Sequence, residues 1–134
     1  MAYPLQSDDT GKLILRLTVG VLMLLHGISK ATNPEGVGGI SSMLVSKGLP
    51  GFIAYGAYVG EILAPLMLIL GVFTRIGALL VVVNMIFAIG LAHVADIFTL
   101  GKQGGWAIEL QGFYLFCAIA LYFLGSGKFA VKPD

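Results

Sequence analysis

Four long apolar stretches, separated by polar or glycine-rich connections, dominate the sequence. They cover about residues 13–30, 52–73, 76–93 and 106–124. Each is close to the roughly 17–25 residues that a helix needs to cross about 30 Å of hydrocarbon. A helix satisfies its own backbone hydrogen bonds, which lipid cannot do for an open strand. The pattern therefore predicts an all-α fold, an integral membrane antiparallel four-helix bundle, as a single domain over residues 1–134.

The connections between these stretches predict how the helices follow one another. Only Thr74 and Arg75 separate the second stretch from the third, so we expect a tight turn between two antiparallel helices. Between the first and second stretches, Val37, Ile40 and Leu44 fall at helical spacing. This spacing predicts a short helix in the membrane interface. The sequence GKQGG at residues 101–105 predicts a turn.

Composition supports the membrane assignment and excludes several classes of protein. The chain is 57% hydrophobic and only 11% charged, whereas a soluble domain carries about 25% charged residues. A net charge of +1 without a Lys/Arg cluster argues against a nucleic-acid partner. The single cysteine, Cys117, can form no intrachain disulfide and no CxxC pair. Any redox role would therefore need a cofactor, a substrate or a partner subunit.

The basic residues indicate an orientation, because cytoplasmic loops carry more Lys and Arg. The side with both termini and the Thr74–Arg75 turn holds more of them than the other side. We therefore expect both termini in the cytoplasm of a bacterial cell, with the protein in the inner (plasma) membrane. The two groups are Lys12, Arg16, Arg75, Lys128 and Lys132 against Lys30, Lys47 and Lys102. The aromatic residues near the span ends fit an interfacial belt: Tyr55, Tyr58, Trp106, Tyr114 and Tyr122.

Ionisable residues inside the spans are the candidate functional groups. Each costs roughly 2.5–3.5 kcal/mol on insertion scales, so each is a functional hypothesis by default. Arg16 lies near the cytoplasmic end of its helix, and we expect it to extend to the lipid phosphates. The others gather in the outer half of the predicted bundle: His26, Lys30, Glu61, His93 and Glu109.

Depth and helical phase bring these polar residues together. Glu61 lies nine positions after Phe52, which is roughly 13 Å below the outer end of the second helix. Asn84 lies nine positions before His93 and should reach a similar depth. His26 and Lys30 are four residues apart and share one face of the first helix.

Small residues predict where the helices approach each other. Gly20 and Gly27 are seven positions apart on the first helix, and Gly56 and Gly60 form a GxxxG pair on the second. Pro65 removes the backbone hydrogen bond to the carbonyl of the residue four positions earlier, so a kink is expected there.

Several motifs together resemble the DoxX family of small bacterial membrane proteins. They are LRLTVGVLMLLHGISKA (15–31), GLPGF (48–52), VGEILAPLMLILGVFTRIGAL (59–79), GGWAIEL (104–110) and GSGKFAV (125–131). The resemblance covers nearly the whole chain. It implies a four-helix bundle in the plasma membrane and identifies His26, Lys30, Glu61 and Arg75 as family-motif positions. Relatives in this family occur beside quinone-linked and detoxification enzymes.

The leading functional hypothesis is a membrane subunit that binds a quinone-like or other small redox-active ligand near the outer leaflet. His26 or His93 would donate a proton, Glu61 would relay one, and Lys30 would stabilise developing negative charge. These four are the candidate catalytic residues, and together with Asn84 and Glu109 they form the candidate ligand-binding set. Electrons would come from a partner oxidoreductase. At most, the chain would be a quinone-linked oxidoreductase subunit without its own redox centre.

Three alternatives remain open at this stage. His26, His93 and Glu109 could provide three ligands to a metal ion, although their spacing is not local. The protein could instead be a non-enzymatic scaffold for a soluble partner, or a transporter. The polar residues could also serve only to fix helix register through a Lys–Glu or His–Glu pair. Self-association in the bilayer is compatible with each of them.

Overall fold

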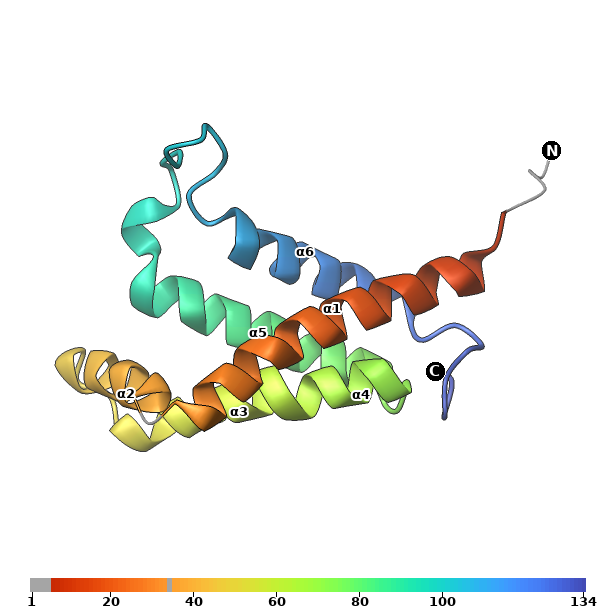
Figure 1. Ribbon diagram of the computed structural model, residues 1–134, viewed down its shortest axis with the longest axis horizontal. Coiled ribbons are helices and arrows are strands. Elements are labelled where there is room, and N and C mark those ends of the chain that lie inside the picture. Colours follow the sequence, from red (N-terminus) through yellow and green to blue (C-terminus); the bar gives the residue numbers. More distant parts are fainter. Residues whose placement is uncertain (1–5, 34) are drawn as a thin grey trace.

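The computed structural model describes residues 6–33 and 35–134, which form helices joined by short connections (Figure 1). The described residues form no extended strand and only two isolated bridges, Val72–Lys132 and Leu100–Trp106. The all-α prediction is therefore confirmed. The main helices are α1 (Asp8–Thr32), α2 (Gly36–Ser46), α3 (Gly56–Tyr58), α4 (Ala64–Leu70), α5 (Thr74–Ala92) and α6 (Glu109–Leu124), with shorter η1 (Gly51–Tyr55), η2 (Val59–Leu63) and η3 (Val94–Asp96).

Within the described residues, three helical stretches are long and apolar enough to cross a membrane. They are Asp8–Thr32, Gly51–Leu70 and Thr74–Ala92, and the second consists of η1, α3, η2 and α4 in succession. The fourth predicted span is shorter than expected, because α6 has 16 residues and begins at Glu109. Trp106 precedes it in a loop, where its indole Nε1 donates a hydrogen bond to the Ile97 carbonyl at 2.6 Å.

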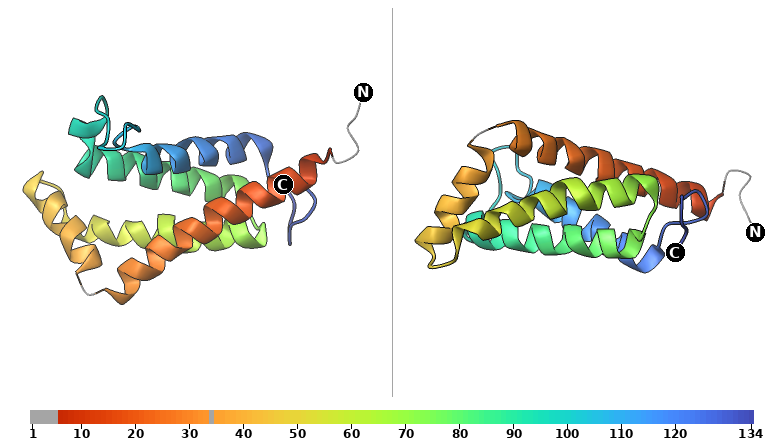
Figure 2. Two further views of the ribbon diagram at one scale, coloured as in Figure 1. Left: turned by 45° about the horizontal axis from the view of Figure 1, so that its top comes forward. Right: turned by 90° about the horizontal axis from the view of Figure 1, so that it is seen from below.

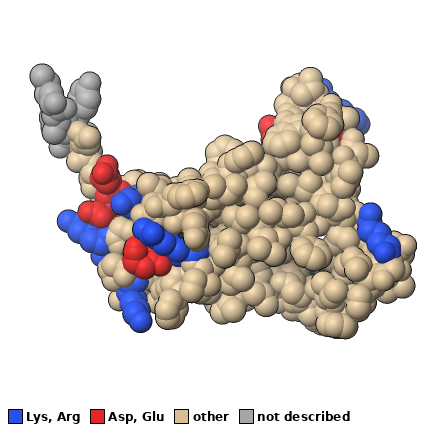
Figure 3. All heavy atoms as spheres, turned by 180° about the vertical axis from the view of Figure 1, so that it is seen from behind, with Lys and Arg blue, Asp and Glu red and all other residues tan. Residues whose placement is uncertain are grey.

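Charged side chains lie at the two ends of the molecule on the face shown in Figure 3, and the band between them carries none. One end holds the beginning of α1 and the C-terminal segment, and the other holds α2 and the connection between α5 and α6 (Figure 1). We call these the terminal end and the α2 end. An apolar band between two charged ends is the surface that a bilayer requires.

The core draws side chains from the three long stretches and from α6. α5 packs most extensively against α6, and α1 packs against α4 (Figure 2). The buried residues shared by these elements are Val19, Met23, Ala64, Leu68, Ala78, Val81, Met85, Tyr114, Ala118 and Leu121. The predicted short helix is present as α2, which packs on η1 through Val37, Leu44 and Ala54.

Glycines set the close approach of α1 to the second span, as the sequence predicted. Gly20 faces the Pro65 carbonyl and Ile69, and Gly27 lies directly on the Glu61 carbonyl. A methyl group at Gly27 would collide with that backbone, so only glycine fits there. Of the GxxxG pair, Gly60 is packed against α5, whereas Gly56 borders open space.

The turn between the second span and α5 differs from the prediction. α4 ends at Gly71, whose left-handed φ of 74° suits glycine, and Thr74 already begins α5. Thr74 and Arg75 are therefore the first residues of a helix, not the turn itself. The turn consists of residues 71–73, and the two helices are antiparallel as expected (Figure 1).

The prediction for Arg16 was wrong. Its side chain is 1% exposed and its Nη2 donates a 2.6 Å hydrogen bond to the Phe129 carbonyl. The C-terminal segment folds back across the terminal end, where Val131 and Lys132 donate backbone hydrogen bonds to the Leu70 and Gly71 carbonyls. Arg16 therefore holds this segment and does not extend to solvent.

Candidate functional site

A buried ion pair joins α1 to the second span. Lys30, in the last turn of α1, places its Nζ 2.5 Å from Oε1 of Glu61. The Glu61 side chain is 7% exposed and that of Lys30 is 26% exposed. A buried carboxylate requires a partner of opposite charge and further hydrogen bonds. Lys30 provides the first of these requirements.

Asn84 of α5 provides the further hydrogen bond that the buried Glu61 carboxylate requires. Its Nδ2 donates a hydrogen bond to Oε2 of Glu61 at 3.2 Å, so both carboxylate oxygens are engaged. Gly60 makes this approach possible, because a Cβ at that position would collide with the Asn84 side chain. The equal depth that the sequence predicted for Glu61 and Asn84 is thus realised as a direct contact. One carboxylate ties together α1, the second span and α5.

The backbone around Glu61 departs from regular α-helix. Residues Val59–Leu63 form a π-turn, in which the Ala64 N–H donates to the Val59 carbonyl five residues earlier. Pro65 follows directly and lacks an N–H of its own. π-turns inside α-helices are frequent at functional sites. The predicted irregularity at Pro65 therefore takes the form of an extra residue in the turn that carries Glu61.

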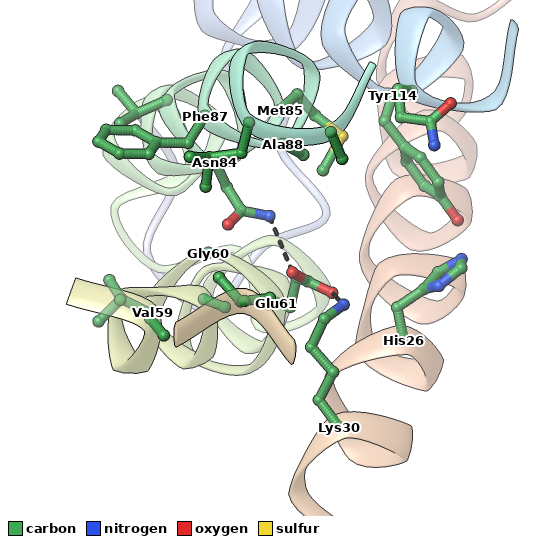
Figure 4. A pocket seen from close by; sticks show the side chains of 18 of the residues that line it. His26, Lys30, Val59, Gly60, Glu61, Asn84, Met85, Phe87, Ala88 and Tyr114 are labelled. Atoms are coloured by element: carbon green, nitrogen blue, oxygen red, sulfur yellow. Dashed lines mark hydrogen bonds and ion pairs between the residues drawn. The ribbon is translucent and has the colours of Figure 1, made fainter. Parts of the chain in front are cut away.

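The ion pair faces a cavity of about 380 Å³ at the α2 end. Figure 4 shows Lys30, Glu61 and Asn84 close together, with His26 also on α1 and Tyr114 on α6 beside them. Most of the remaining lining is apolar and comes from α1, α2, the second span and α5, including Met23, Leu44, Ala57, Met85 and Phe87. A few polar groups on an otherwise apolar wall are typical of small-ligand sites.

His26 and Tyr114 form an aromatic pair beside the ion pair. Their ring centroids are 5.9 Å apart with the planes at 87°, which is an edge-to-face contact. Tyr114 is 8% exposed and belongs to the core. The sequence analysis assigned it to the interfacial belt and so missed it as a site residue. Its spacing of four and seven from Ala118 and Leu121, both buried, could have indicated an inward face.

His93 lies at the rim of the cavity and not beside Glu61. Its Nδ1 is 3.5 Å from Oδ2 of Asp96, and its Nε2 is 3.4 Å from Nε2 of Gln111. Both His93 and Gln111 line the cavity. Gln111 is a second residue that the sequence analysis did not single out, and no charge or motif marks it.

Glu109 lies apart from this group. Its side chain is exposed, packs against Gly105 and does not line the cavity. The structure therefore brings together His26, Lys30, Glu61 and Asn84, places His93 at the rim, and leaves Glu109 outside. Among the described residues no three His, Cys, Asp or Glu side chains are close enough to hold a metal ion, so the proposed His26–His93–Glu109 metal set is not formed.

These features define a class: a small membrane protein of apolar helices with a polar, ion-paired pocket between them. The sequence profile of the DoxX family matches residues 11–94, and the chain belongs to this family.

Two curated proteins illustrate the relationship. A Bacillus subtilis protein named "Putative oxidoreductase CatD" is 33% identical over 128 residues, which cover 96% of this chain and 89% of the relative. An uncharacterized protein of Haemophilus influenzae is 31% identical over 131 residues, with coverage of 90% and 85%. No solved structure gives a significant match to this chain.

Proposed function

We propose that the protein resides in the bacterial plasma membrane and that α1, the second span, α5 and α6 cross the bilayer as an antiparallel four-helix bundle. The three long apolar stretches and the apolar band between charged ends support this arrangement. α6 is short, but the loop before it carries Trp106, a residue favoured at the interface. Five basic residues at the terminal end against three at the α2 end favour cytoplasmic termini.

We further propose that the cavity binds the head group of a quinone-like, redox-active ligand. The observation that carries this proposal is the Glu61 carboxylate, which is buried between Lys30 and Asn84 on the wall of an apolar cavity. A quinone carries two carbonyl acceptors on an apolar ring, so it needs donors on one wall and apolar contacts elsewhere. Lys30, the Tyr114 hydroxyl and the ring nitrogens of His26 offer such donors.

The residues around the cavity would have different chemical roles. Reduction of a quinone bound there to the quinol would consume two electrons and two protons. The imidazole rings of His26 and His93 line the cavity and can hand a proton to a ligand oxygen. Glu61 can pass a proton inward, and Lys30 can stabilise negative charge at the same oxygen. The described part of the chain has one cysteine, Cys117, and therefore no dithiol pair that could deliver two electrons. In this proposal the electrons come from a partner oxidoreductase. The name of the Bacillus subtilis relative, "Putative oxidoreductase CatD", agrees with a redox role.

Replacement of Glu61 by Gln tests the proposal. The wild-type protein and the variant are placed in lipid nanodiscs, and binding of a radiolabelled decyl-benzoquinone is measured by filtration. We expect E61Q to bind about tenfold more weakly, which corresponds to about 1.4 kcal/mol. E109Q is the matched control, because it makes the same chemical change outside the cavity, and it should bind like wild type. Equal binding by all three proteins would refute the proposal.

A further inference from the structure

A second hollow lies between α1 and α6, on the side of the molecule. It is separate from the cavity that the Lys30–Glu61 pair faces, which we call the polar cavity because of the polar groups on its wall. The second hollow has a volume of about 360 Å³ and its walls are almost entirely apolar. α1 contributes Ile14, Leu15, Thr18, Val19 and Leu22, and α6 contributes Leu110, Phe113 and Cys117. Ile14, Leu22 and Phe113 are also largely exposed, so the hollow is a groove open to the surrounding lipid. We call it the α1–α6 groove.

The groove and the polar cavity share two residues. Leu110 and Tyr114 line both of them. Tyr114 also contacts His26 by its ring edge, which places it between the groove and the polar wall (Figure 4). Two side chains therefore separate the buried ion pair from the lipid-facing groove.

α2 and η1 contribute apolar side chains to the cavity wall at the α2 end. Ile40, Met43 and Leu44 of α2 form part of the cavity lining there, together with Ile53 and Ala54 of η1. α2 and η1 pack on each other through their own small core. For a ligand dissolved in the bilayer, the α1–α6 groove is an approach to the cavity from the side of the molecule.

We propose that the α1–α6 groove binds the apolar tail of the ligand whose head group occupies the polar cavity, and that the ligand enters from the bilayer past Leu110 and Tyr114. This inference rests on the proposed function and narrows the ligand to a lipid-soluble molecule with a long apolar chain. The wall that the groove and the cavity share at Leu110 and Tyr114 favours this occupant over an unrelated lipid chain.

The test fills the groove without touching the cavity. Thr18 is exposed and lines the groove, so T18F occupies the space of the tail. L17F is the matched control, since Leu17 is 37% exposed and lines neither hollow. C117F fills the groove from the α6 side and provides an independent second variant. Thermal unfolding in detergent confirms that each variant remains folded.

Binding is measured for two ligands with the same ring, a decyl-benzoquinone and the benzoquinone without the chain. The ratio of variant to wild-type affinity is compared for each ligand, because partitioning into lipid cancels in that ratio. We expect T18F and C117F to weaken binding of the decyl compound about tenfold and to leave the tail-less compound unchanged. L17F should alter neither.

The outcomes separate this inference from the proposed function. If both compounds bind the wild type and depend on Glu61, but T18F and C117F bind the decyl compound normally, the groove holds only ordinary membrane lipid and the inference is wrong. If neither compound binds the wild type, the proposed function fails as well.

Discussion

The Lys30–Glu61 pair should couple strongly enough to measure in a double-mutant cycle. The perturbations are K30M, E61Q and the double variant, each compared with wild type by equilibrium unfolding in mixed detergent. Two unit charges about 4 Å apart attract by about 4 kcal/mol at an effective dielectric constant of about 20. The desolvation of Glu61, which is 7% exposed, offsets much of this gain.

The size of the coupling distinguishes a true buried pair from an ordinary polar contact. Removal of one member of a fully buried pair costs about 3–5 kcal/mol. Lys30 keeps 26% exposure, so we expect K30M to cost about 2 kcal/mol. E61Q should cost about 1 kcal/mol, since its amide oxygen still accepts from Asn84. The double variant should cost about 1.5 kcal/mol, which gives a coupling of about 1.5 kcal/mol.

The comparison value is the average for polar contacts between membrane helices, about 0.6 kcal/mol. K47M is the control, because Lys47 is exposed at the end of α2, and it should change stability by less than about 0.5 kcal/mol. A coupling no larger than the error of the cycle would show that the pair is not formed in the folded protein in detergent, and the account of Glu61 would be wrong.

Three further predictions concern packing and the pocket. G27A should destabilise the protein by at least about 2 kcal/mol, because its methyl group meets the second span, whereas G38A on α2 has open space and should be neutral or slightly stabilising in the same unfolding assay. R16M should release the C-terminal segment, and trypsin should cleave after Lys128 several-fold faster than in wild type; an unchanged rate would contradict the role of Arg16. Y114F keeps the ring contact but removes the hydroxyl, so decyl-benzoquinone binding should fall about threefold to tenfold with unchanged stability, and unaltered binding would exclude the hydroxyl as a donor.

The sequence could predict the similar depth of Glu61 and Asn84, and offer a Lys–Glu pair as one alternative, because these depend on two regular quantities. One is the helical rise, which sets the depth of each residue, and the other is the alternation of direction between successive helices. The glycine stripe on α1 was predictable for a similar reason, since close approach of two backbones requires small residues at fixed spacing.

The remaining features depend on geometry that periodicity does not contain. Arg16 looked like a residue near a helix end, and its burial results from the C-terminal segment, which folds back through irregular backbone contacts. Tyr114 is a different case, because its residue type suggested the interfacial belt whereas its spacing from Ala118 and Leu121 could have indicated the buried face of α6.

The pairing of Lys30 with Glu61 has a consequence for the charge of whatever the cavity admits. One positive and one negative group within 2.5 Å make the polar wall neutral as a unit. Transfer of a net charge from water into a low-dielectric site is costly unless a counter-charge is present there, and before a ligand binds Lys30 and Glu61 compensate each other. An uncharged molecule meets no such cost. The cavity therefore favours neutral ligands over ions of either sign, and it does so through charge rather than shape.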